Sequence, residues 1–390
     1  MAAWRWPRWL LLSLTVLGVV FGGTVVVQRL ATLPIGASDF NAYWSASRLL
    51  LEGRNPSDPA NMLEMERAYF NPDQDFTMMA WNPPTLWVFM LPVAWLPFQT
   101  ARVIWLLINV TLAMASCLML GLVYLPRGRV APLLTYLLLA ACFSPMLLAF
   151  LTGQVTFLVV FGVAASLFMV KQQWWFGAGA ALILTSVKPH LVILVGPYLL
   201  LYIAVRRKWI GWLGLGLSGA ACVAILFVLR PSWLVDFMGL LDAPPIDWAT
   251  PTLGGLLSLY SAGRWVRFIG LGFLLVLPVL IRRPKQFSLE TSASVLTLLT
   301  LPTTFFGWSY DQSLLLIPIA QVVGWLFEPM RSALGRWLLV AAMLAALAAN
   351  MAQRVATTDE VYFFWVPLAW AGVYVAARYL RRNTSSPLLV

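Results

Sequence analysis

Charged residues are scarce in this chain. Its 26 basic and 15 acidic side chains make up 11% of the 390 residues, whereas 61% of the residues are hydrophobic. The sequence returns repeatedly to apolar runs near the ~20 residues that span a bilayer as a helix. A helix satisfies its own backbone hydrogen bonds inside lipid. The composition therefore predicts an all-α, polytopic integral membrane protein rather than a soluble globular one.

Histidine and cysteine are also rare. His190 is the single histidine, and the three cysteines (Cys117, Cys142 and Cys222) fall inside apolar runs without metal-ligand spacing. We expect the cysteines to be packing residues, and we expect neither a metal ion nor a cofactor.

Several familiar motifs are missing as well. The chain has no phosphate-binding Gly-Lys-Ser/Thr loop, no dinucleotide fingerprint, no paired-histidine zinc motif and no Gly-x-Ser-x-Gly elbow. These absences count against ATP-driven transport and hydrolase chemistry. No internal repeat is evident, which weakens an inverted-repeat transporter without excluding it.

The net charge of +11 does not indicate nucleic acid, because the basic residues form short clusters between apolar runs rather than one basic face. Under the positive-inside rule such clusters mark the cytoplasmic side of a membrane. The clusters are Arg5 with Arg8, 206–208, 282–285, Arg331 with Arg336, and Arg378 with Arg381 and Arg382. The acidic residues concentrate in the intervening loops.

Between these clusters we predict about twelve transmembrane helices in a single domain over 1–390, with both termini cytoplasmic. They lie near 9–27, 103–125, 131–150, 155–170, 174–187, 189–205, 209–229, 264–281, 288–305, 312–327, 336–352 and 361–377. The first run is expected to be retained rather than cleaved. The stretch 81–98 is interrupted by four prolines and is expected to cross only in part.

The first extracytoplasmic loop, 28–80, is long enough to fold onto the membrane. Ser38 as N-cap and Gly53 as C-terminal stop predict an amphipathic interfacial helix with Asp39 in its first turn. Asn61 and Glu64 have the spacing of a capping box that would begin a second short helix. The loop 231–263 is the other large extracytoplasmic segment.

In this topology several polar groups meet on the extracytoplasmic face. They are Asp39, the break at 152–154, the break at Lys188 to His190, and the stretch 306–312. Ionisable groups near membrane depth are costly and usually face an internal cavity, so each is a candidate for function.

Plainer interpretations stay open for each group. Asp39 can simply favour the positive end of its helix. Lys188 can extend to the interface, His190 can be a satisfied buried histidine, and Asp311 can be the structural partner of an arginine. Gln154 can cap a helix end, and the aromatic candidates (Tyr43, Trp44 and Trp308) can be interfacial anchors.

The residues resemble glycosyltransferase family 87. The resemblance rests on Asp-Phe-x-x-Tyr-Trp from Asp39, Asn82-Pro83-Pro84, Gly153-Gln154 and Lys188-Pro189, and it covers roughly residues 30 to 315. It implies a GT-C-type membrane fold and an inverting transfer of sugar, mannose or arabinofuranose, from a polyprenyl phosphate to a lipid or glycan acceptor. It also implies the bacterial inner membrane as the location, with the active site on the extracytoplasmic face.

By this resemblance Asp39 matches the catalytic base of the first extracytoplasmic loop, and the chemistry of the residues agrees. Sugar transfer needs a group that accepts the acceptor proton, and a cation to stabilise the leaving phosphate. We expect Lys188 with His190 to bind the phosphate, with Arg264 in reserve. The expected substrate-binding residues are Tyr43, Trp44, Asn82, Gln154, Trp308, Tyr310, Asp311 and Gln312.

One departure from the family pattern concerns Asp311 and Gln312. Family members commonly carry histidine near the end of this stretch, so the substitution implies another sugar or a different hydrogen-bonding scheme around the donor phosphate. Two alternatives to a transferase remain, namely a lipid-linked sugar flippase or other transporter, and a scaffold subunit of an envelope assembly. The sequence does not identify the sugar, acceptor, linkage or oligomeric state.

Overall fold

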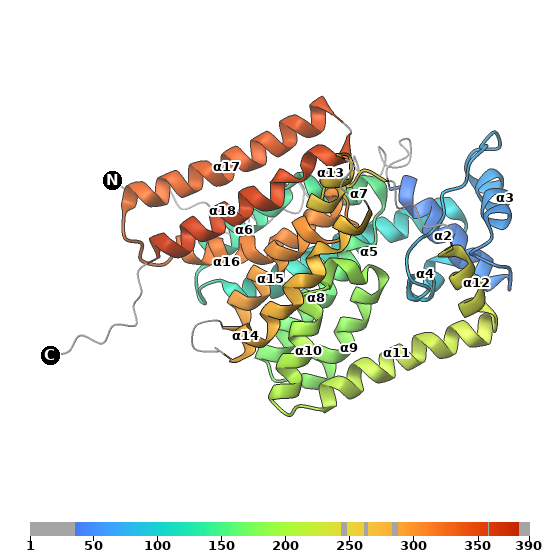
Figure 1. Cartoon of the computed structure of the whole chain (residues 1–390), viewed down its shortest axis with the longest axis horizontal. Helices are drawn as coiled ribbons and strands as arrows, with labels where there is room; N and C mark the ends of the chain where they lie inside the picture. Colours follow the sequence, from blue (N-terminus) through green and yellow to red (C-terminus); the bar gives the residue numbers. More distant parts are fainter. Residues whose placement is uncertain (1–35, 243–247, 261–263, 283–287, 358, 382–390) are drawn as a thin grey trace, which may run out of the picture.

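The computed structural model describes residues 36–242, 248–260, 264–282, 288–357 and 359–381. Within these ranges the regular structure is helical, apart from one isolated bridge between Met330 and Arg381. Figure 1 shows the helices as a long bundle with the short helices α2, α3 and α12 gathered at one end. The all-α prediction is confirmed.

Five helical segments in the described residues are long and apolar enough to cross a membrane. They are α5 (Phe98–Tyr124), α11 (Ile210–Leu229), Trp265–Arg282, α17 (Ala333–Ala356) and Glu360–Leu380. Trp265–Arg282 comprises most of η3 (Arg264–Val276) and α14 (Leu277–Arg282), and Glu360–Leu380 comprises η5 (Glu360–Phe363) and α18 (Trp365–Leu380). The pair α6 (Val130–Ala141) and α7 (Ser144–Thr152), bent by 55°, makes a sixth if it is one span.

These spans make the chain a multi-pass membrane protein. Shorter apolar helices occupy other predicted spans: α8 (Thr156–Lys171), α9 with η1 (Trp175–Val187) and α10 (Val195–Val205). The total of twelve crossings stays a prediction, and its first member, 9–27, lies outside the described residues. The proline-rich stretch 81–98 contains α4 (Thr85–Ala94), a helix of ten residues that includes Pro92.

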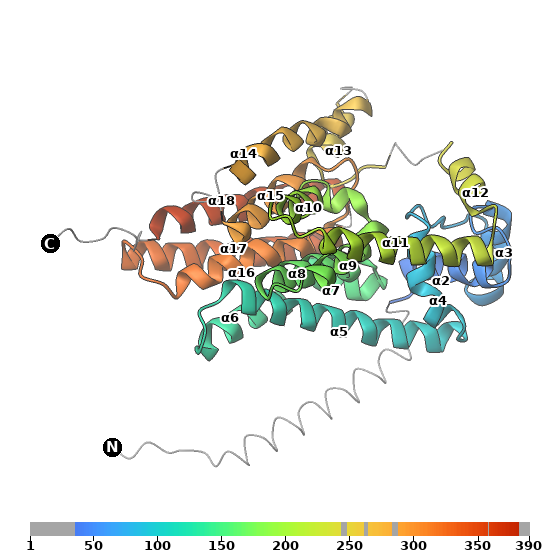
Figure 2. The ribbon, with the colours of Figure 1, turned by 90° about the horizontal axis from the view of Figure 1, so that it is seen from below.

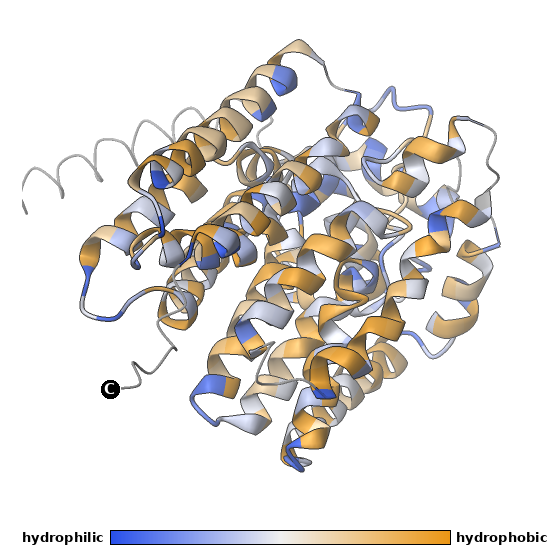
Figure 3. Ribbon diagram, turned by 60° about the vertical axis from the view of Figure 1, so that its left-hand side comes forward, coloured by the Kyte–Doolittle hydropathy of each residue, from blue (hydrophilic) through white to orange (hydrophobic). Residues whose placement is uncertain are grey.

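The outer faces of the long helices are apolar. On α11, for example, Leu213, Leu217 and Val228 are exposed, and only four of its twenty residues are buried. Figure 3 shows hydrophobic residues over these faces and hydrophilic residues at many of the turns. Such a surface suits contact with lipid tails rather than water.

At one end of the bundle, helices α2 (Ser38–Leu51), α3 (Pro59–Tyr69), α4 and α12 (Trp233–Leu240) lie near one another (Figures 1 and 2). Arg230, at the end of α11, donates to the Gly53 carbonyl at 2.8 Å and so joins α11 to the turn after α2. At the opposite end, Lys171 pairs with Glu290 at 2.9 Å and Arg381 with Glu328 at 2.6 Å. The predicted extracytoplasmic and cytoplasmic segments therefore collect at different ends.

Helix α2 corrects two details of the sequence analysis. Its N-cap is Ala37, without a side-chain cap, so Ser38 is the first helical residue instead of the cap. Ten of its fourteen residues are buried against neighbouring helices, so α2 has far less free surface than an amphipathic interfacial helix. The predicted stop is in place, because Gly53 takes a left-handed φ of 69° directly after the helix end.

Two further details differ from expectation. Helix α3 begins at Pro59, where Asp58 accepts the Ala60 N–H at 2.9 Å, so the capping box expected from Asn61 does not form. Cys117 and Cys142 also differ from one another: Cys117 is buried as expected, but Cys142, which follows the end of α6, is exposed. A one-dimensional pattern marks apolar runs and does not reveal which side of a helix packs.

Six further elements complete the part of the chain that the structure describes. They are η1 (Ile183–Val187), η2 (Pro189–Val192), α13 (Leu253–Ser258), α15 (Leu289–Thr303), η4 (Ser309–Leu315) and α16 (Leu316–Leu326). Helix α8 has twelve buried residues out of sixteen and packs between α5 and α9. The breaks before α8, between η1 and η2, and before η4 are where the polar residues of the next section lie.

Candidate active site

The side chain of Gln154 joins the acidic residue of the first loop to a buried lysine. Its Nε2 donates to Asp39 Oδ2 at 2.5 Å, and its Oε1 accepts from Lys188 Nζ at 2.9 Å. Gln154 stands in the break between α7 and α8, where Gly153 takes a left-handed φ of 71°. A single amide thus fixes the spacing between a carboxylate and an ammonium group.

Asp39 lies in the first turn of α2 and is half-buried. The segment before it is fixed to the end of α7, because Gly36 N–H donates to the Leu151 carbonyl at 2.7 Å. Burial raises the pKa of Asp39 above its ordinary value, while the Gln154 hydrogen bond and the Lys188 charge act in the opposite direction. The positive end of a helix explains why an acidic residue is favoured at this position. It does not explain the hydrogen bond from Gln154, a residue 115 positions away in sequence.

Lys188 lies between η1 and η2, and its side chain is 5% exposed. Its ammonium group donates to Gln154 Oε1, to Thr156 Oγ1 at 3.3 Å and to Asp311 Oδ1 at 2.7 Å. Just before it, the Val187 carbonyl accepts from Asn82 Nδ2 at 2.9 Å. Asn82 thus holds the backbone next to Lys188 and is not among the three hydrogen-bond partners of the lysine side chain.

Asp311 anchors the site from η4 and is 1% exposed. Its Oδ1 accepts from Lys188 and from Thr156 Oγ1 at 2.6 Å, and its Oδ2 accepts the Trp308 N–H at 2.9 Å. The sequence analysis left open an arginine as its partner, and the structure pairs it with Lys188. Thr156 was not a candidate, because a threonine in the first turn of an apolar helix carries no distinctive signal.

Aromatic residues surround the side chains of Gln154 and Lys188. Tyr43 Oη donates to Gln154 Oε1 at 3.0 Å, and the Lys188 ammonium lies 4.6 Å from the centre of the Tyr310 ring. Trp308 stacks on Tyr310 at 6.3 Å and contacts Trp248 at 5.6 Å between ring centres. Tyr310 and Trp308 are both half-buried, so part of each ring remains available to a bound molecule.

Four candidates from the sequence lie differently. Trp44 is 1% exposed and packs edge-on against Phe98, so its side chain lies in the core between α2 and α5. Gln312 donates to the Phe363 carbonyl at 3.0 Å and so ties η4 to η5. The His190 ring faces Phe305 at 5.8 Å instead of joining the Gln154 contacts, and the Arg264 side chain lies outside the described residues.

A second ion pair supports η4 and was missed at the sequence level. Arg354 Nη1 pairs with Glu360 Oε1 at 2.9 Å, and Glu360 Oε2 accepts the Ser309 N–H at 2.8 Å. Arg354 also donates to Ser309 Oγ at 2.5 Å. The only available signal was the acidic pair Asp359-Glu360 in a predicted extracytoplasmic loop. Its contact with Ser309 joins residues 51 positions apart, which no local pattern reveals.

The arrangement suits transfer chemistry that releases an anion. A half-buried carboxylate with a raised pKa can accept a proton, and a buried ammonium group nearby can stabilise developing negative charge. Within the described ranges, no group of three His, Cys, Asp or Glu side chains could hold a metal ion.

The sequence model of glycosyltransferase family 87 matches residues 81–305. The chain belongs to glycosyltransferase family 87. No curated protein and no solved structure matches it. As a family 87 member, the protein is a membrane glycosyltransferase, which confirms the family expected from its motifs.

The matched region of family 87 contains Gln154 and Lys188, whereas Asp39 and Asp311 lie before and after it. The site thus combines residues inside the family match with two acids outside it. The contacts among these four side chains connect the three regions directly.

Proposed function

We propose that this family 87 enzyme transfers a sugar from a polyprenyl phosphate to a hydroxyl group of a lipid or glycan acceptor, with Asp39 as the catalytic base. The observation that carries the proposal is the Gln154 side chain, which holds Asp39 and Lys188 on its two polar atoms. A base and an anion-stabilising cation are the two groups that this reaction needs.

In the proposed step, the acceptor oxygen attacks the anomeric carbon, and its proton passes to the Asp39 carboxylate. The bond between the anomeric carbon and the phosphate oxygen breaks, and its electron pair stays on the phosphate. Attack and departure on opposite faces of the sugar invert the anomeric configuration. Asp39 suits the base because it is half-buried and so is within reach of a bound acceptor.

Lys188 is proposed to bind the phosphate group of the donor through its ammonium group. Its three donors are occupied by Gln154, Thr156 and Asp311. Because Gln154 and Thr156 are neutral, either of their contacts costs less to exchange for a phosphate oxygen than the ion pair with Asp311, which keeps the ammonium in place. Tyr310 and Trp308 supply half-buried aromatic faces on which the sugar or the first isoprene unit can stack, while the buried Tyr43 orients Gln154 through its hydroxyl group.

The finer assignments follow from the family resemblance. We propose mannose as the sugar, with arabinofuranose as the alternative, and the extracytoplasmic face of a bacterial inner membrane as the location. The end of the bundle that carries α2, α3 and α12 is the face that would hold the acceptor.

The test is transfer of radiolabelled sugar by purified wild type and Asp39→Asn, from polyprenyl-phosphate-mannose and from the arabinofuranose donor. Loss of a general base lowers rates by roughly 10²–10⁴-fold, so we expect Asp39→Asn to be almost inactive while eluting as a folded protein. Asp73→Asn, at an exposed site on the same loop, is the matched control and should keep full activity.

Equal activity in Asp39→Asn and wild type would remove Asp39 from the mechanism. Wild type that transfers neither sugar but moves a labelled polyprenyl-phosphate sugar across vesicle membranes would support a flippase instead. Full function in variants that lack both Asp39 and Lys188 would point to a scaffold.

A further inference from the structure

An apolar groove lies beside the Lys188 turn. It has a volume of about 420 Å³ and is lined by residues of α9, η1, η2 and α10, with Phe305 at one edge and Leu215 of α11 at another. Ligand pockets in proteins usually span roughly 300–1,000 Å³. The groove is therefore large enough for part of a long apolar chain.

The hydroxyl groups in the groove are turned away from it. Thr185 Oγ1 donates to the Leu182 carbonyl at 2.7 Å, and Ser186 Oγ donates to Thr85 Oγ1 at 2.8 Å. The surface that remains is almost wholly apolar, although three of the lining residues (Thr185, Ser186 and His190) are polar. A polar ligand would find few partners here, whereas a hydrocarbon would find many.

The groove is continuous with the candidate active site along the chain. Pro189 and His190 line it and directly follow Lys188, whose ammonium group lies among the site residues. From Pro189 to Leu200 the groove follows η2 and the first turns of α10, a distance on the order of 15 Å at helical rise. The lysine and the start of the groove are therefore consecutive in the chain, so a long-chain phosphate bound at Lys188 would have the groove beside it.

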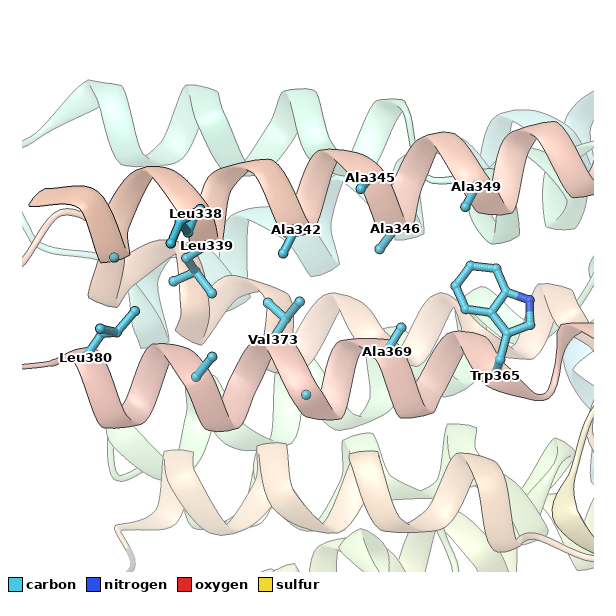
Figure 4. A pocket seen from close by; sticks show the side chains of 13 residues that line it. Leu338, Leu339, Ala342, Ala345, Ala346, Ala349, Trp365, Ala369, Val373 and Leu380 are labelled. Carbon is cyan, nitrogen blue, oxygen red and sulfur yellow. The ribbon is translucent and has the colours of Figure 1, made fainter. Parts of the chain in front are cut away.

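A second groove shows what a site without this connection looks like. It has a volume of about 670 Å³, lies between α17 and α18, and is lined mainly by alanines and other small residues (Figure 4). Neither groove is lined by the Gln154 cluster itself, but this second groove also has no lining residue that neighbours the cluster in sequence, as Pro189 neighbours Lys188 in the first. Labelling of this second groove therefore measures the background binding of ordinary membrane lipid.

We propose that the η1–α10 groove binds the prenyl chain of the donor, with the first isoprene units beside His190 and Phe305 and the later ones along Leu200 and Leu215. The inference rests on the proposed function and adds to it the place of the lipid half of the donor. In this arrangement the chain length of the donor affects binding through the groove, while the sugar and phosphate are handled at Asp39 and Lys188.

The decisive experiment combines photolabelling with kinetics. A polyprenyl phosphate carrying a diazirine in its third isoprene unit is irradiated with the full-length protein in nanodiscs, and the labelled peptides are mapped by mass spectrometry. We expect labels on the peptide that contains α10 or on that of α11, and fewer on α17 and α18. Labelling does not require turnover, so it is informative whichever sugar is transferred.

Variants that fill the groove provide the second readout. Leu200→Trp projects into the groove, and Leu201→Trp, its exposed neighbour on the other side of α10, is the matched control. Gly196→Leu is a second filler, since a Cβ there would lie 3.5 Å from Val192 Cγ2, in ordinary contact. For a long-chain donor we expect KM to rise about tenfold in both fillers, as when several buried methylene groups lose their contacts. For a donor with two isoprene units KM should change less than about twofold.

Labels spread equally over the α17–α18 groove would mean that the η1–α10 groove holds only bulk lipid, and the proposal would fail. It would fail as well if Leu200→Trp and Leu201→Trp changed KM alike, or if the fillers affected long and short donors equally. By contrast, wild type that takes the label in this groove but transfers no sugar from any polyprenyl phosphate would overturn the proposed function while leaving the groove assignment in place.

Discussion

Lys188 and Asp311 form an ion pair of 2.7 Å in which the two side chains are 5% and 1% exposed. The pair links the turn between η1 and η2 to η4. Taking two charges out of water costs free energy that their attraction only partly repays, so removing one partner leaves a costly buried charge. The pair therefore affects both the stability of the fold and the charge available to a substrate.

Stability and activity should separate in variants of this pair. We expect Lys188→Met and Asp311→Asn each to destabilise the protein by about 3–5 kcal/mol, the cost of one unpaired buried charge. The double variant should recover much of that stability, because no charge remains unpaired. Thermal unfolding in detergent gives the first quantity, and sugar transfer gives the second.

Activity should be lost in both variants that lack Lys188, including the stable double variant. An active double variant would show that the lysine only balances Asp311 and does not stabilise the leaving phosphate.

The pH dependence of transfer should report Asp39. Burial raises its pKa, and the base must be ionised, so kcat/KM should fall on the acid side at a pH above the ordinary carboxyl range. The Gln154 hydrogen bond lowers the same pKa. Gln154→Leu should therefore move the acid limb to higher pH, besides lowering the maximal rate. An acid limb that stays in place in Gln154→Leu would assign it to another group.

Glu66 should make stability depend on pH. It is buried in α3 and accepts from Gln74 Nε2 at 2.6 Å and from the Met78 N–H at 3.1 Å, and burial raises its pKa to about 7. Between its ordinary pKa and pH 7 the folded state binds more protons than the unfolded state. Its contribution to stability therefore falls as pH rises through this window.

Glu66→Gln removes this titration. Relative to wild type, the variant should unfold at a higher temperature by a few degrees at pH 8, and the difference should shrink at pH 5. Unfolding followed by intrinsic fluorescence at the two pH values makes the comparison. An equal difference at both would mean that Glu66 does not titrate in this range.

Gly153 should not tolerate a side chain. Its φ is 71°, and a Cβ there would lie 2.5 Å from the Gly36 carbonyl oxygen. Gly153→Ala should push the segment that precedes Asp39 away from α7 and lower transfer at least tenfold, since small displacements of catalytic groups cost large factors in rate. Gly216→Ala, whose Cβ would meet nothing within 4 Å, is the matched control and should behave as wild type.

The apolar runs predicted most of the helices that the structure describes, because hydrophobic length directly limits what can span a bilayer. Local capping was harder to predict, since Ser38 and Asn61 have the right residue types but Ala37 and Asp58 occupy the cap positions. The four segments of the site could be assigned to one face from charge alone. Their pairing could not, as the choice of Lys188 for Asp311, with Thr156 between them, depends on how distant helices pack.

The roles of supporting residues were the least predictable. Arg354 and Glu360 look like ordinary loop charges in sequence, yet they hold the N-terminal end of η4 through Ser309. Trp44 illustrates the reverse, since a tryptophan that was expected to bind substrate packs into the core. Both outcomes depend on which side of a helix faces its neighbours, α17 for Arg354 and α2 for Trp44.

The ion pair also has a consequence for how the protein is made. Asp311 follows Lys188 by 123 residues, so at roughly 5–20 residues per second the ribosome needs on the order of ten seconds between them. During that time the lysine has been synthesised without its acidic partner, a costly condition for a charge at membrane depth. The ion pair can therefore form only after residue 311 has been synthesised, and a chain released earlier lacks the acidic partner of its buried lysine.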